Sequence, residues 1–233
     1  MPPKKSASAK FDFKKVYKDC YAPKPTPLRI FVPMLSFIVV QGAGNPNESA
    51  YQKALQTLYA LSYTLKMSKQ TKNLKDYMEY VVPPLESLWW GNENLSDKAN
   101  FKWQAMIAQP DFITQELFEW AQKEVQGKKG IDCAKARLLR FEEGQCVQIL
   151  HIGSYDEEPQ SLAKLEDFIV RTGLQNDTSK DNPIRAHHEI YLSNPNKTPA
   201  HKLKTILRIP VREVWGKNTK RKHESERLKI AAN

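Results

Sequence analysis

The chain has only three cysteines, and none of them belongs to a CxxC pair. Cys20, Cys133 and Cys146 are odd in number and far apart, which indicates reduced thiols and argues against a disulfide framework or a zinc site. Glycine is also scarce, and the glycine-bearing stretch GAGNPN, 42–47, lacks the Walker-type and GxGxxG patterns. A nucleotide site is therefore not expected.

Long apolar runs are missing as well. FVPMLSFIVV, 31–40, is interrupted by Pro33 and Ser36 and falls short of the ~20 apolar residues of a spanning helix. The N-terminus carries lysines without an apolar stretch, so no secretory signal is expected and the predicted location is cytoplasmic. HExxH, DxDxDG and GxSxG motifs do not occur, and His187 and His188 would point to opposite faces of a strand. We therefore expect no metal, no cofactor and no serine nucleophile.

The net charge of +10 is concentrated at the two ends of the chain. Residues 1–25 hold seven lysines against two aspartates, and residues 200–233 hold ten basic residues against three glutamates, which leaves a net charge of −2 between them. This distribution predicts a basic, disordered tail over 1–30, a folded domain over 31–213 and a basic C-terminal tail over 214–233. We expect weak, salt-dependent contacts with anionic surfaces, but no specific nucleic-acid binding and no membrane association.

Apolar periodicity predicts an α+β fold. Strands are expected at 36–42, 76–90, 101–109, 135–142, 145–153, 187–193 and 206–212, with helices at 48–67, from Pro110 to Gly127 with Thr114 as N-cap, and from Pro159 to Gly173. The order strand, helix, strand, strand occurs twice. We expect a curved antiparallel sheet with helices on one face and a concave apolar groove on the other.

The run HHEIYLSN, 187–194, places a carboxylate between a histidine and a tyrosine, because side chains alternate along a strand. His187, Glu189 and Tyr191 would share one face. Trp89 and Trp90 would point to opposite faces, so only one of them can face the helices. Any one of these side chains has a plain alternative, since a single aromatic is usually core and a single strand carboxylate is often exposed. As a group, a tryptophan from the first half of the chain and Tyr155, Glu189 and Tyr191 from the second make a shared aromatic groove the alternative to plain packing.

Several segments make the chain resemble the GyrI-like small-molecule-binding domains, between Ile38 and Val211: IVVQGAGNPN, PPLESLWWG, WQAMIAQPDFIT, FEEGQCVQILHIGSYDEEP and HHEIYLSNPNKTPAHKLKTILRIPV. The resemblance implies two strand-helix-strand-strand modules related by a pseudo-twofold axis, with a groove for hydrophobic or aromatic compounds and Glu189 near its centre. The chain is similar to the stand-alone subgroup that includes cyclopropanoid cyclopropyl hydrolases. It departs from the family where Asn194 replaces the usual aspartate.

The resemblance therefore implies binding of hydrophobic xenobiotics and their detoxification by hydrolysis of the cyclopropane of DNA-alkylating compounds. Glu189 and Tyr155 are the catalytic candidates. The candidate ligand-binding residues are Trp89, Trp90, Trp103, Phe112, Tyr155, His187, Glu189 and Tyr191. The alternative is a non-catalytic protein that sequesters such compounds, acts as an effector-binding domain or modulates a protein partner such as a topoisomerase. The sequence leaves open which is correct, and also the oligomeric state.

Overall fold

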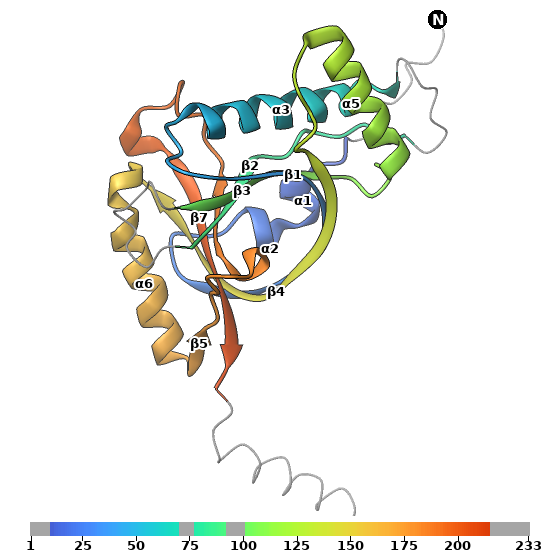
Figure 1. Ribbon diagram of the computed structural model, residues 1–233. Coiled ribbons are helices and arrows are strands. Elements are labelled where there is room, and N and C mark those ends of the chain that lie inside the picture. Colours follow the sequence, from blue (N-terminus) through green and yellow to red (C-terminus); the bar gives the residue numbers. More distant parts are fainter. Residues whose placement is uncertain (1–9, 70–76, 92–100, 215–233) are drawn as a thin grey trace, which may run out of the picture.

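The computed structural model describes residues 10–69, 77–91 and 101–214 and shows an α+β fold (Figure 1). Two short helices come first and are followed by seven strands and three longer helices: α1 (Phe13–Val16), α2 (Lys18–Tyr21), β1 (Leu28–Ala43), α3 (Ser49–Lys66), β2 (Leu85–Trp90), β3 (Lys102–Gln109), α5 (Gln115–Lys129), β4 (Arg137–Ile152), α6 (Glu158–Arg171), β5 (Leu174–Asn176), β6 (His187–Tyr191) and β7 (Lys204–Glu213). In these ranges no helix is both long and apolar enough to cross a membrane.

The sheet curves until it closes on itself. Its strand order is β4-β1-β3-β2-β6-β7-β5, and β4 also pairs with β7, so that six strands form a ring. Every pairing within the ring is antiparallel. The predicted curved antiparallel sheet is confirmed, but the face without long helices is the interior of a barrel and not an open groove.

Strand β4 replaces the two strands predicted at 135–142 and 145–153. Gly144 interrupts the alternation of side chains without ending the strand, because its φ of +73° lies in a region that glycine adopts freely. Phe141 and Glu143 point into the barrel before it, and Cys146 and Gln148 point inward after it. One continuous strand therefore lines the interior on both sides of the irregularity.

The helix boundaries follow their capping residues. Thr114 accepts a hydrogen bond from the amide of Leu117 and begins α5, as predicted, but the helix continues past Gly127 to a left-handed cap at Gly130. Gly173 follows the end of α6 with a φ of +69°, as predicted. Only 85–90 of the strand predicted at 76–90 forms β2, because Pro83 and Pro84 lie directly before it.

Three apolar clusters hold these layers together. The first lies between the outer face of the sheet and helices α3 and α5, and the second lies between β4, β7 and α6. The third fills the barrel and includes residues from β1, β2, β3, β4, β6 and β7. Figure 1 shows α3 and α5 on one side of the sheet and α6 on another.

The N-terminal segment 10–27 contributes to the interior cluster, so the predicted tail over 1–30 is wrong for residues 10–30. Phe13 and Tyr21 are each only 2% exposed, and α1 and α2 lie within the curve of β4 (Figure 1). The charge count led to the wrong prediction because it registers Lys14, Lys15 and Lys18, which lie on the outer side of this segment, and not its aromatic residues, which face inward. The rest of the predicted tails, 1–9 and 215–233, lies outside the described residues.

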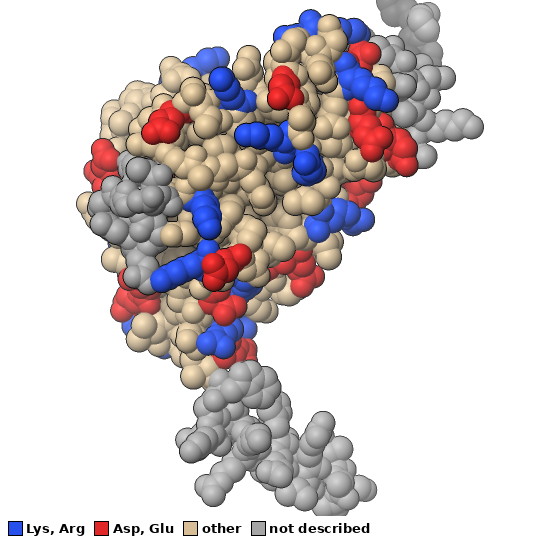
Figure 2. All heavy atoms as spheres, in the orientation of Figure 1, with Lys and Arg blue, Asp and Glu red and all other residues tan. Residues whose placement is uncertain are grey.

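The described surface mixes charges of both signs. On the face shown in Figure 2, basic and acidic side chains lie beside one another over the body of the protein. Among the described residues, ion pairs join opposite charges at the surface, such as Arg29 with Glu213 at 2.9 Å and Arg171 with Asp167 at 2.8 Å. This agrees with the near-neutral charge of the central part of the sequence.

Candidate functional site

Strand β6 places His187, Glu189 and Tyr191 on the outer face of the barrel, as their alternation predicts. His188 and Ile190 are buried on the opposite, inner face. Cross-strand pairing with β2 sets Trp89 opposite His187, Ser87 opposite Glu189 and Leu85 opposite Tyr191, and partners of this kind share a face. The sheet register therefore answers which of the two tryptophans accompanies Glu189: it is Trp89.

Polar contacts connect the outer-face residues Trp89, Tyr191, Glu189 and His187, here called the outer row, into one unit. The Tyr191 hydroxyl donates to Glu189 Oε2 at 2.7 Å, and Trp89 Nε1 donates to the Tyr191 oxygen at 3.3 Å. Glu189 Oε1 lies 3.3 Å from His187 Nε2, and the two side chains are 15% and 17% exposed. Burial and the neighbouring Glu189 raise the pKa of Tyr191 well above its usual value, so the phenol keeps its proton and remains a donor.

Helix α3 supplies an aromatic side chain that sequence analysis assigned only to its apolar stripe. The Tyr51 ring lies 5.4 Å from that of Trp89 and 5.1 Å from that of Trp103, and its hydroxyl is 2.7 Å from Ser87 Oγ. Trp103 is 2% exposed behind Tyr51, where the missing Cβ of its cross-strand partner Gly42 leaves room for the indole. Trp103 therefore supports the wall of the site from behind.

Tyr155 completes the wall from the other half of the chain. It begins the short helix η2 (Tyr155–Glu157), which a capping box between Ser154 and Glu157 holds in front of α6. Its ring packs edge-on against that of Tyr191 at 6.2 Å, and the side chain is 40% exposed. Burial, followed by the charges of Glu158 and Glu189, raises the pKa of Tyr155, so its hydroxyl is available as a donor.

Two predicted site residues lie elsewhere. Trp90 points to the opposite face from Trp89 and packs against the cluster inside the barrel. Phe112 contacts the rings of Tyr77 and Tyr80. The Tyr77 hydroxyl bonds to the last residue of α3, whereas Tyr51 lies in the first turn of that helix. Phe112 therefore lies near the opposite end of α3 from the Glu189 cluster, which comprises His187, Glu189, Tyr191, Trp89, Tyr51 and Tyr155. Both belong to the packing of the domain, the ordinary role of a single aromatic.

The inner face of the same strands carries a buried ionic network that sequence analysis missed. His188 contacts two carboxylates, with Nδ1 at 3.1 Å from Glu143 Oε2 and Nε2 at 3.0 Å from Glu86 Oε2. Arg208 donates to Glu143 at 2.8 Å and to Gln148 at 3.0 Å. The network is completely enclosed and joins β2, β4, β6 and β7 at the centre of the barrel.

The N-terminal segment satisfies the remaining polar groups of this network. Arg208 donates to the Cys20 carbonyl at 2.7 Å, Gln148 donates to the Asp19 carbonyl, and Tyr21 donates to Glu86 Oε1 at 2.7 Å. Because a buried polar atom without a partner is costly, these contacts tie residues 19–21 to the interior. The segment is therefore part of the folded domain.

Charges set the protonation of the network. Burial alone would raise the pKa of Glu143, but the charges of His188 and Arg208 outweigh it and hold that pKa at about 2. Burial alone would lower the pKa of His188, but Glu143 and the hydrogen bonds with both carboxylates raise it. With His188 protonated, two carboxylates face two cations, and the interior is electrically balanced.

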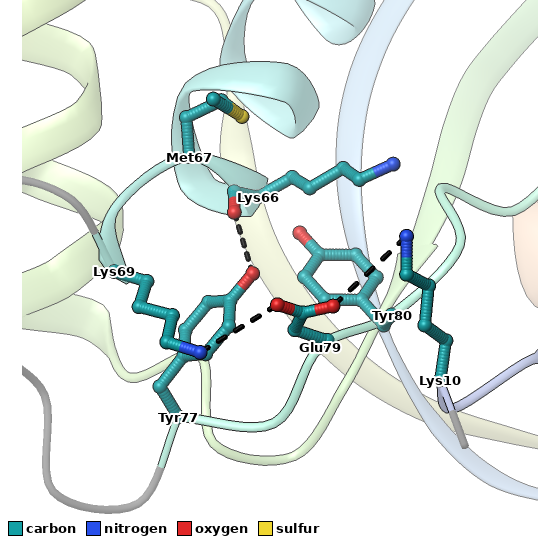
Figure 3. A pocket seen from close by; sticks show the side chains of 7 residues that line it. All are labelled: Lys10, Lys66, Met67, Lys69, Tyr77, Glu79 and Tyr80. Atoms are coloured by element: carbon teal, nitrogen blue, oxygen red, sulfur yellow. Dashed lines mark hydrogen bonds and ion pairs between the residues drawn. The ribbon is translucent and has the colours of Figure 1, made fainter. Parts of the chain in front are cut away.

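A small surface pocket of about 170 Å³ lies at the C-terminal end of α3, opposite the end that carries Tyr51 (Figure 3). Glu79 pairs with two of its lysines, Lys69 at 3.5 Å and Lys10 at 3.9 Å, while Tyr77 donates to the Lys66 carbonyl at 2.6 Å. These contacts fasten residue 10 and its neighbours to the domain. They leave the Glu189 cluster as the better candidate for ligand binding.

The chain matches the model of the GyrI-like small molecule binding domain over residues 30–212. It belongs to the GyrI-like family. The family resemblance drawn from the sequence is thereby confirmed, and this GyrI-like domain is a small-molecule-binding domain. In the described ranges, no group of three His, Cys, Asp or Glu side chains is arranged to hold a metal ion.

Solved structures similar to this GyrI-like protein include two from Listeria innocua. An uncharacterized conserved protein is 48% identical, with a TM-score of 0.83 over 87% of this chain and 100% of that one. A hydrolase is 46% identical, with a TM-score of 0.81 over the same shares. The protein EcmrR, solved in a complex with DNA, is 13% identical over 81% of this chain and 58% of that one, with a TM-score of 0.51, and shares the fold alone. The comparison with curated proteins found no match.

Proposed function

We propose that this protein binds hydrophobic or aromatic xenobiotics at the Glu189 cluster and detoxifies them by adding water to an activated cyclopropane. The observation that carries the proposal is a half-buried carboxylate held by Tyr191 within a wall of Trp89, Tyr51 and Tyr155. The hydrolase from Listeria innocua, at 46% identity, supports a hydrolytic reaction, and the resemblance noted in the sequence supports the cyclopropane as its target.

The reaction needs one base and one place for negative charge. The water oxygen bonds to the methylene carbon of the ring as the carbon–carbon bond breaks, and the released electron pair moves through a conjugated dienone to its carbonyl oxygen. Water gives up one proton, and the new phenolate gains one, so the product is the substrate plus one water. Aromatic side chains hold the flat substrate, and the Tyr155 hydroxyl donates a hydrogen bond to the oxygen on which charge develops.

Glu189→Gln tests whether the carboxylate is required for the reaction. We expect turnover of a spirocyclopropyl cyclohexadienone to fall by roughly 100-fold or more, while the compound still binds. The glutamine amide keeps the shape of the glutamate side chain, but it can neither accept a proton nor supply the negative charge of the carboxylate. Mass spectrometry of the product heavier by one water gives the rate. Glu166→Gln, an exposed change on α6, is the matched control. Equal rates for the wild type and Glu189→Gln would remove Glu189 from the mechanism.

A non-catalytic binding protein is the second candidate. Both oxygens of Glu189 already contact side chains, Tyr191 on one and His187 on the other, an arrangement that also suits a carboxylate that only shapes a ligand site. A wild-type protein that binds the dienone without converting it would establish this alternative.

Trp89→Ala is expected to weaken binding of the same dienone about tenfold, since ~1.4 kcal/mol is typical of a lost aromatic contact. Isothermal titration calorimetry measures the affinity. Trp90→Ala is the matched control, because Trp90 is adjacent in sequence but packs on the opposite face. If both variants bind as tightly as the wild type, the ligand lies elsewhere.

A further inference from the structure

The Glu189 cluster contains a second group that can handle a proton, the imidazole of His187. We propose that His187 takes the proton from water and that Glu189 acts through it, as the carboxylate that holds the imidazole in place. This inference rests on the proposed function and assigns roles within that same site.

The geometry of the outer row carries the assignment. His187 Nε2 lies 3.3 Å from Glu189 Oε1, while the other oxygen of Glu189 accepts the Tyr191 hydrogen bond. The carboxylate is thus held from one side and faces the imidazole on the other. Of the two nitrogens of His187, Nδ1 makes no hydrogen bond with any described residue, and it remains available to a water molecule.

His187 lies beside the aromatic wall formed by Trp89, Tyr51 and Tyr155. Trp89 is its cross-strand partner, and Tyr155 reaches the same cluster through Tyr191. Among these neighbours Glu189 is the charged group in contact with the imidazole. The side chain is 17% exposed, so water reaches a ring that is otherwise enclosed. A base in this position adjoins both the aromatic surface and the solvent.

A carboxylate paired with an imidazole divides the work of a general base. With its Oε1 at 3.3 Å from Nε2, Glu189 favours the tautomer that carries its proton on Nε2 and its lone pair on Nδ1, and it stabilises the imidazolium once that has formed. Imidazoles ordinarily titrate near neutrality, and carboxyls about two pH units lower, so an imidazole is the stronger base toward water at neutral pH. The pair therefore suits water activation better than the carboxylate alone.

The step balances with His187 as base. One proton of water moves to Nδ1 as its oxygen bonds to the methylene carbon, and the electron pair of the broken carbon–carbon bond reaches the carbonyl oxygen as phenolate. Tyr155 donates a hydrogen bond to that oxygen. The imidazolium then gives its proton to the phenolate or to solvent, which restores the neutral imidazole and releases the alcohol and phenol in one product. No oxidant or reductant is required.

Kinetics with a spirocyclopropyl cyclohexadienone test the inference in the full-length protein. We expect His187→Gln to lower kcat by roughly 100-fold with little change in KM, and to abolish the acid limb of the pH–rate profile. His187→Ala leaves space for free imidazole, which should restore turnover in proportion to its concentration. His201→Gln, an exposed histidine, is the matched control. Melting temperatures confirm that each variant is folded, and imidazole rescue reports on chemistry even where a variant is less stable.

The possible failures are distinguishable. If the wild type hydrolyses the dienone and His187→Gln keeps its rate within about twofold, His187 is a bystander and only this inference fails. Loss of turnover in His187→Ala that imidazole does not restore, with an unchanged pH profile, also overturns it. If the wild type does not hydrolyse the dienone at all, the proposed function fails and this inference with it.

Discussion

Glu143→Gln is expected to lower the free energy of unfolding by about 3–5 kcal/mol, the usual cost of removing one partner from a buried ion pair. Glu143 contacts both Arg208 and His188 inside the barrel, at 2.8 Å and 3.1 Å. The amide cannot balance their charges, and neither cation can reach water without opening the sheet. For a domain of this size, the loss corresponds to a melting temperature lower by roughly 10 °C.

Urea unfolding followed by circular dichroism measures this effect. Glu142→Gln is the matched control, because Glu142 directly precedes Glu143 on β4 and is exposed, so the free energy of unfolding of its variant should be within about 0.5 kcal/mol of the wild-type value. Equal stability of the two variants would show that the network contributes no net stabilisation.

The same network gives stability a defined pH dependence. The folded-state pKa of Glu143, about 2, is below its ordinary 4.5, so its contribution is present above pH 4.5 and is lost as the pH falls toward 2. The folded-state pKa of His188 is raised, so its contribution is complete below its ordinary value of 6.5 and disappears as the pH rises through the folded-state value. In Glu143→Gln, the free energy of unfolding should therefore fall less steeply as the pH decreases below 4.5.

Deletion of residues 1–22 is expected to abolish cooperative folding. It removes Phe13 and Tyr21 from the barrel, and truncation of one buried phenylalanine alone typically costs ~3–5 kcal/mol. The deletion also removes the Cys20 carbonyl, to which Arg208 donates, and the Tyr21 hydroxyl, which donates to Glu86. Each buried group left without a partner costs about 1–3 kcal/mol of stability. Calorimetry should show no unfolding transition.

Deletion of residues 1–9 is the control for this experiment, since it leaves Phe11 free to pair with Tyr80. Tyr21→Phe separates packing from hydrogen bonding: it keeps the ring, and we expect it to lose about 1–3 kcal/mol. A fully folded protein without residues 1–22 would mean that the N-terminal segment only covers an already stable barrel.

Local patterns in the sequence were sufficient to predict which residues lie together in the outer row of the site. Strand alternation placed His187, Glu189 and Tyr191 together, and the grouping of aromatic residues in the sequence added Trp89 and Tyr155. Tyr51 was not recognised because its helical spacing fits core packing equally well, and only the tertiary structure sets its ring against Trp89. The inner network was missed for a similar reason. Glu86, Glu143 and Arg208 are far apart in sequence and meet only because three different strands face the same interior.

The fold was predictable where periodicity and capping signals were strong, as in α3, α5 and α6. Closure of the sheet was not, because it depends on pairing between β4 and β7, whose register no local signal specifies. The N-terminal segment was misjudged because a sum of charges does not distinguish a solvated tail from an amphipathic segment with Phe13 and Tyr21 on one side.

The closed ring of strands has a consequence for how the protein behaves when concentrated. Open sheets end in rows of unpaired backbone amides and carbonyls, which recruit strands from other molecules and start aggregation. Here β4 and β7 occupy each other's hydrogen-bonding groups over Cys146–Ile152 and Lys204–Pro210, and β5, which pairs with the end of β7, is three residues long. So short an edge offers little for another chain to extend. Closure over this stretch lets the domain carry aromatic side chains on its outer face with fewer free backbone groups on which its own copies can assemble.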